Sequence, residues 1–181
     1  IGEDEDILTR VAELAKPLDS IRNKVVAAAE APIDGNREVC RVQECEMGNL
    51  IADALLDRVK DQGVSIAIMN SGGVRASIDA GEITMGEVLT VLPFQNTLAT
   101  FQLSGADIIA ALENGVSQVE EVKGRFPQVA GLSFTWDPSV PANEGRIKVI
   151  DFGIARASKQ GDADSDATET KFDAGDLGAL T

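Results

Sequence analysis

The chain has 181 residues, of which 44% are apolar, and a formal net charge of −14 at pH 7. This length suits one domain of ordinary size with a packed core. The negative charge repels phosphate backbones and anionic lipids, which disfavours nucleic-acid binding. No apolar run approaches the roughly 20 residues that cross a bilayer, so no membrane span is expected.

Histidine is absent from the sequence. Catalytic sites that use histidine as a general base or as a metal ligand therefore cannot be built from this chain alone.

The first half of the chain predicts two amphipathic helices followed by a strand. Apolar side chains in residues 7–28 fall on one helical face, which predicts a helix that lies on another part of the molecule, with Pro17 as a break or kink. A second apolar stripe over residues 50–59 predicts a second helix, which Gly63 ends. The run VSIAIM, residues 64–69, lacks clean alternation and is typical of a strand buried on both faces.

The middle of the chain predicts a short capped segment and a strand. Thr84 and Glu87 have the spacing of a helix-capping box, and Pro93 stops the short apolar run that follows them. Residues 96–105, NTLATFQLSG, are rich in β-branched and apolar residues and predict a strand.

Helices and strands continue to alternate up to about residue 155. Ser104 and Asp107 predict the capped start of a helix that closes at Gly115. Residues 125–139 predict a strand or hairpin, and residues 145–155 predict one more strand. This irregular alternation favours an α+β fold in which helices pack on a mixed β-sheet.

Residues 156–181 are rich in Asp, Ala, Ser and Thr and predict an acidic loop or tail. Asp162, Asp164 and Asp166 imitate the start of a calcium-binding loop, but Ala167 and Asp173 occupy positions where that loop has glycine and glutamate. A charged linker is the simpler interpretation. The sequence therefore divides into an N-terminal linker helix at residues 1–29, a domain at residues 30–155 and this tail.

The two cysteines, Cys40 and Cys45, are separated by four residues. A metal site would need two further soft ligands, which the chain lacks. The pair is compatible with a disulfide in a short loop, which would place the protein outside the cytoplasm, or with two buried thiols.

The sequence NSGGVR, residues 70–75, directly follows the expected buried strand. The consecutive glycines Gly72 and Gly73 allow a sharp turn whose backbone N–H groups point at a ligand, and Arg75 is close enough to add a positive charge. The alternative is an ordinary glycine turn with a surface arginine.

Three blocks of the sequence occur together and in a fixed order: CRVQECEMGNLIADALL from Cys40, IAIMNSGGVRASIDAGEITMGEVLTVLPFQNTLATFQLSGADIIAALENGV from Ile66, and GRFPQVAGLSFTWDP from Gly124. Together they resemble the C-terminal domain of the 5′-nucleotidase family, two-domain nucleotide hydrolases that include ecto-5′-nucleotidase and bacterial UDP-sugar hydrolase. The resemblance covers residues 30–138. It implies a domain that supplies the nucleoside pocket, beside a separate N-terminal metallophosphoesterase domain that holds two divalent metal ions and performs hydrolysis.

The resemblance implies that the following residues bind the nucleotide or nucleoside: Arg41, Asn70, Gly72, Gly73, Arg75, Phe94, Asn96 and Gly124. Arg41 would contact the nucleotide, and Asn70 and Arg75 would form hydrogen bonds with its base or ribose region. The alternative for Arg41 is an exposed arginine paired with Glu44 or Glu46.

Phe94 matches one of two aromatic rings between which the base stacks, Asn96 matches a polar neighbour that reaches the base in some members, and Gly124 matches a loop position near the base. A phenylalanine packed in the core after Pro93 is the alternative for Phe94. The two cysteines coincide with a pair that forms a disulfide in some animal members of the family, which favours the disulfide.

The sequence departs from the family downstream of residues 145–155. The second stacking phenylalanine and a GGDG motif are expected there, and KFDAGD at residues 171–176 is a poor match. Half of the base clamp is therefore missing. Either a segment between about residues 151 and 170 is omitted from this sequence, or the protein has lost it and should bind nucleotides poorly.

We therefore expect the nucleotide-binding domain of an exported 5′-nucleotidase-like phosphohydrolase, located outside the cell, on its surface or in the periplasm. That enzyme would convert a nucleoside monophosphate to nucleoside and phosphate. Because the two-metal centre cannot be built without histidine, this chain alone is not expected to be catalytic, and its implied partner is the metallophosphoesterase domain. The alternative is a free-standing binding or structural module, such as a surface or filament subunit.

Overall fold

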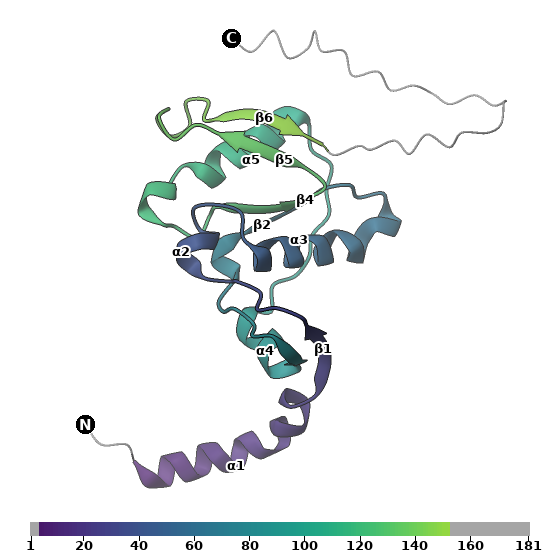
Figure 1. Ribbon diagram of the computed structural model, residues 1–181, viewed down its shortest axis with the longest axis vertical. Helices are drawn as coiled ribbons and strands as arrows, with labels where there is room; N and C mark the ends of the chain where they lie inside the picture. The colour runs from purple at the N-terminus through teal and green to yellow at the C-terminus, as the bar shows by residue number, and fades with distance from the viewer. Residues whose placement is uncertain (1–3, 153–181) are drawn as a thin grey trace, which may run out of the picture.

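The computed structural model of the protein describes residues 4–152 (Figure 1). Helix α1 (Glu5–Arg22) projects from one end and leads through strand β1 (Val25–Ala29) into the body of the molecule. No helix in residues 4–152 is both long and apolar enough to pass through a bilayer. The acidic tail and its calcium-like aspartates, predicted at residues 156–181, lie outside the described residues.

Helix α1 ends earlier than its apolar pattern predicts. The β-branched start of β1 instead pairs antiparallel with β3 (Gly81–Thr84), and Ala27 lies opposite Ile83. Pro17 lies inside α1 and does not end it. Helix α1 contacts α4, but within the described residues its apolar face is not covered, since none of its residues is buried and Ile7 is 62% exposed.

Strand β2 (Ala67–Asn70) pairs antiparallel with β4 (Pro127–Ala130), and helix α3 (Glu46–Val59) packs against this pair. The strand predicted within residues 64–69 is confirmed, but its burial on both faces is wrong. Ile68 is 40% exposed because the pair has only two strands and its side chains alternate between a more covered and a more open face.

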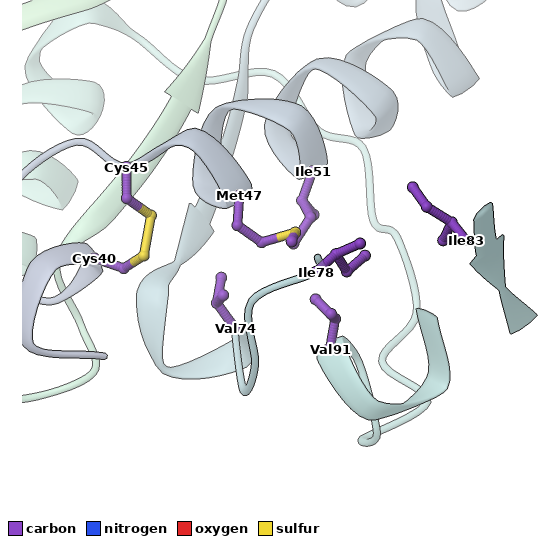
Figure 2. Packing of buried hydrophobic residues seen from close by; sticks show 8 residues of the cluster. All are labelled: Cys40, Cys45, Met47, Ile51, Val74, Ile78, Ile83 and Val91. Carbon is purple, nitrogen blue, oxygen red and sulfur yellow. A yellow bond between two sulfur atoms is a disulfide. The ribbon is translucent and has the colours of Figure 1, made fainter. Parts of the chain in front are cut away.

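A core cluster joins the short helix α2 (Arg37–Cys40), α3, the turn after β2, β3 and α4 (Met85–Val91), as Figure 2 shows. Its buried members are Cys40, Cys45, Met47, Ile51, Val74, Ile78, Ile83 and Val91. Val74 belongs to the glycine turn that the sequence singles out. The side chain of Val74 therefore anchors this turn in the core.

Both predicted capping boxes are confirmed. Thr84 caps α4 together with Glu87, and Ser104 caps α5 (Gly105–Val116) together with Asp107. The strand predicted at residues 96–105 is wrong: the chain from α4 to α5 is an extended connection in Figure 1, and Phe101 is 74% exposed. Within residues 4–152 no strand pairs with this segment, so no ladder of hydrogen bonds forms.

Strand β5 (Ser133–Trp136) pairs antiparallel with β6 (Ile147–Asp151), whereas β4 pairs with β2. The strands predicted in residues 125–139 are thus present but do not form a hairpin together. Gly131 separates them with a φ of 77°, a conformation that favours glycine. A second core cluster of Val116, Val119 and Phe126 lies against β5 and β6.

The α+β class is confirmed, although the described strands form three antiparallel pairs where a mixed sheet is expected. The remaining described elements are three short 3-10 helices, η1 (Lys60–Gln62), η2 (Ser71–Gly73) and η3 (Val119–Glu121).

Candidate functional site

The glycine turn is formed by η2 at the end of β2 and is hydrogen-bonded to the segment that precedes β4. The N–H of Ser71 donates to the carbonyl of Phe126 at 2.9 Å, and the N–H of Gly72 donates to the carbonyl of Gly124 at 2.7 Å. The side-chain amide of Asn70 donates to the same Gly124 oxygen at 3.2 Å. The N–H groups of Ser71 and Gly72 are therefore already used within the fold. Contrary to the expectation from the sequence, the turn does not present them to a ligand.

What the glycines permit is a close approach of two backbone segments. A Cβ atom on Gly72 would lie 2.9 Å from the carbonyl oxygen of Gly124, and one on Gly124 would lie 2.7 Å from the Cα of Gly72. Side chains at these two positions would push the segments apart. The same position on Gly124 is 3.7 Å from the guanidinium carbon of Arg41, so the crossing also lies beside that arginine.

Three arginines line one cavity of about 210 Å³: Arg37, Arg41 and Arg75. The guanidinium of Arg41 donates to the carbonyl of Val122 at 3.4 Å, and that of Arg75 donates to the carbonyl of Gly72 at 3.5 Å. Both bonds are long, and the buried Nε of Arg41 has no hydrogen-bond partner within the described residues. These long bonds therefore satisfy the guanidinium groups of Arg41 and Arg75 only weakly within the fold.

The electrostatics of this cavity favour an anion. The pKa of Arg41 lies below its ordinary value, first because burial disfavours its charge and then because Arg37 and Arg75 are positive neighbours. The carboxylate of Glu38 acts in the opposite direction on the pKa of Arg41, and it contacts Arg37 at 3.2 Å on the surface. An anion among the three guanidinium groups would relieve their mutual repulsion.

Phe94 follows α4 and is not a core residue, because 55% of it is exposed. The guanidinium carbon of Arg75 lies over its ring, 5.6 Å from the centroid. This cation–π contact connects the ring to the arginine cavity and leaves much of the aromatic surface open. Asn96 is exposed two residues further on, where the extended connection to α5 begins.

The structure therefore brings most of the residues expected from sequence into one region. Arg41, Gly72 and Gly124 meet at the backbone crossing, while Arg75 joins the cavity to Phe94. Arg37 lines the same cavity but was not expected in the site. The signal that could have found it is its spacing of four residues from Arg41, although α2 is only four residues long and its direction depends on tertiary contacts.

Cys40 and Cys45 form a disulfide, with their Cα atoms 5.0 Å apart. This bond closes the short loop that carries Arg41, from the end of α2 to the N-cap of α3. Within residues 4–152 no group of three or more His, Cys, Asp or Glu side chains is placed to hold a metal ion.

A larger cavity of about 540 Å³ lies on the loop and the first turn of α3. Its lining residues are Asp34, Val39, Gln43, Glu44, Cys45, Glu46 and Asn49. Three carboxylates on this lining oppose the binding of a phosphate group. The smaller cavity is therefore the better candidate for an anionic ligand, despite its size.

Similar proteins place this chain in a family. The family model described as "5'-nucleotidase, C-terminal domain" matches residues 25–165. The chain is 44% identical over 135 residues to the trifunctional nucleotide phosphoesterase protein YfkN of Bacillus subtilis. This match covers 74% of this chain and 9% of that protein. The chain is also 34% identical over 159 residues to the 5′-nucleotidase of Bos taurus, and this match covers 82% of this chain and 28% of that protein.

A solved structure agrees with these matches. The 5′-nucleotidase precursor from Thermus thermophilus superimposes with a TM-score of 0.74 at 45% identity, and the match covers 81% of this chain and 29% of that one. The chain therefore belongs to the 5′-nucleotidase C-terminal domain family. It spans less than a third of the length of each of these relatives.

Proposed function

We propose that this domain binds the nucleoside and an adjacent anionic group of a nucleotide, as the specificity half of an exported 5′-nucleotidase-like phosphohydrolase. The reaction would convert a nucleoside monophosphate to nucleoside and phosphate. Hydrolysis itself would take place at two divalent metal ions in a separate metallophosphoesterase domain. The relatives' names support the reaction class, and their greater length supports a further domain.

The observation that carries this proposal is the convergence of three arginines beside an exposed aromatic ring, in a chain whose net charge is −14. A nucleotide combines a flat apolar base with a negative group, and these two features match the ring and the cavity. In this arrangement the base stacks on the open face of Phe94, and Arg75 backs the ring and contacts the ribose or the anionic group.

The remaining residues have supporting roles in the proposal. Arg41 and Arg37 complete the anion site, and Asn70, held by Gly124, forms hydrogen bonds with the ligand through its side-chain oxygen. Asn96 reaches the base. Gly72 acts by letting the turn approach Gly124 closely, so that the arginines converge, whereas a Cβ atom on Gly73 would meet only the end of Met69 at 3.5 Å.

The disulfide supports a location outside the cytoplasm, because such bonds persist in oxidising compartments. Export to the periplasm, the cell surface or the medium remains part of the proposal. It is tested by fractionating the source cells and probing the fractions with an antibody against this domain. Accumulation in the cytoplasm with reduced cysteines would contradict it.

Titration calorimetry with adenosine, AMP and inorganic phosphate tests the binding function. We expect AMP to bind more tightly than adenosine or phosphate, and Phe94→Ala to weaken AMP binding by about 5- to 150-fold, the value of one lost stacking contact. Phe101→Ala is the matched control, because that ring is also exposed and lies on the connection beyond the site. Binding should not respond to EDTA, because the proposed ligand groups are arginines, amides and an aromatic ring.

A free-standing binding or structural module is the alternative. Its supporting feature is the missing second half of the base clamp, which the sequence does not reproduce. If neither Phe94→Ala nor Arg75→Ala changes the binding of any nucleotide, the arginine cavity is not the functional site and this alternative is favoured.

A further inference from the structure

Gln128 is a buried polar residue for which neither the sequence nor the proposed ligand site gives a role. It lies in the middle of β4, and only 1% of it is exposed. Its side-chain nitrogen donates to the carbonyls of Cys40 and Gln43, both at 2.8 Å, and its side-chain oxygen accepts from the N–H of Cys45 at 3.2 Å. Both donor hydrogens and one acceptor site of the amide are thus used.

All three partners are backbone groups of one loop, residues 40–45, which carries Arg41. The disulfide joins only the two ends of this loop. Gln128 also holds its interior, because Gln43 lies two residues beyond Arg41. A buried amide that bonds both ends and the interior fixes the path of the loop more completely than the covalent bond alone.

The side chain of Gln128 is itself fixed by packing. A Cβ atom on Gly48, in the first turn of α3, would come within 2.3 Å of its side-chain oxygen. Only glycine therefore leaves room for the amide to pass the helix and reach the loop.

The strand that carries Gln128 also holds the other half of the site through its main chain. Pro127 lies opposite Asn70 in the β2–β4 pair, and the carbonyl of Phe126 accepts from Ser71. One short segment thus contacts the Arg41 loop by a side chain and the Asn70 turn by its backbone. The distance between Arg41 and that turn depends on this segment.

We propose that Gln128 is a positioning residue that holds the Arg41 loop against the glycine turn, and so sets the geometry in which the arginines meet an anionic ligand. The ligand part of this inference rests on the proposed function. An apolar residue of similar size would leave two carbonyls and one N–H in the protein interior without partners, and the loop would move to recover them.

A double-mutant cycle tests whether Gln128 acts through Arg41. Gln128→Met keeps the size of the side chain and removes its hydrogen bonds, and it should weaken AMP binding by about tenfold. In an Arg41→Ala background the same substitution should change AMP affinity by less than about twofold, because the group being positioned is gone. An equal loss in both backgrounds would show a general structural effect and overturn the proposal.

The rate at which dithiothreitol reduces the disulfide gives a measurement that does not depend on a nucleotide. We expect faster reduction of Gln128→Met than of the wild-type protein under conditions where urea titration shows both to be folded. Gln102→Met is the control, since Gln102 is exposed on the connection between α4 and α5. Equal reduction rates in all three proteins would contradict a hold on the loop.

Two further outcomes are distinguishable. If the wild-type protein binds no AMP, the proposed function fails, and the reduction rates still decide whether Gln128 holds the loop. If Gln128→Met does not fold, Gln128→Asn replaces it, because this variant keeps the amide but is too short to reach all three partners. The expected and contradicting results are the same for this variant.

Discussion

Reduction of the Cys40–Cys45 disulfide should destabilise the protein moderately without unfolding it. The two cysteines are five positions apart, and closing so short a loop in the unfolded chain is worth about 2 kcal/mol at 25 °C by the loop-entropy relation. The loop should stay in place after reduction, because its bonds to Gln128 do not involve sulfur and Cys40 remains in the core.

Urea unfolding at 25 °C, with and without a phosphine reductant, measures this difference. The Cys45→Ala variant is the control, because it has no disulfide and its stability should not respond to the reductant. A loss above about 4 kcal/mol would refute the reasoning, since the hydrogen bonds would then be unable to hold the loop alone, and a loss below about 0.5 kcal/mol would refute the loop-entropy estimate. AMP affinity should fall less on reduction than it does in Gln128→Met.

Two other predictions concern buried and capping groups. Arg146→Met should lower the free energy of unfolding by about 2–4 kcal/mol, because the carbonyls of Val116 and Val140 lose their donor; an unchanged urea midpoint would exclude this role. Hydrogen bonds from the backbone and hydroxyl of Thr84 lower the pKa of the Glu87 carboxyl in the folded state. Ionised Glu87 therefore adds stability above its unfolded pKa of about 4.3, and this is lost as the pH falls through the lower folded pKa. The melting temperatures of wild type and Glu87→Gln should converge between pH 7 and about pH 2.5, and a pH-independent difference would contradict the shift.

The parts of the fold that could be predicted from sequence are those held by local hydrogen bonds. Both capping boxes are correct because each joins residues only three positions apart. The end of the first helix and the strand at residues 96–105 were wrong because strand formation depends on a distant partner. Val25–Ala29 has one in Gly81–Thr84, whereas the described residues supply none for 96–105.

The candidate site also has residues that could be predicted from the sequence and one that could not. The resemblance of three sequence blocks to a known family identifies Arg41, Arg75 and Phe94. In the structure the two arginines line one cavity, and the ring of Phe94 lies beside it, under Arg75. Gln128 could not be found from sequence, since it looks like any polar residue in a strand and its backbone partners lie 83 to 88 positions away. What distinguishes Gln128 from other polar residues in strands is its burial, which one sequence does not show.

The crossing of Gly72 and Gly124 limits how the candidate site can vary. Each glycine is already the smallest residue, so a larger side chain at one position has no smaller replacement at the other to compensate for it. Under the proposed function, a new base preference is therefore more accessible through the exposed side of the candidate site, at Phe94 and Asn96, where side chains can be exchanged without displacing the backbone crossing. A library for altered base selectivity should vary these two positions and leave the crossing intact.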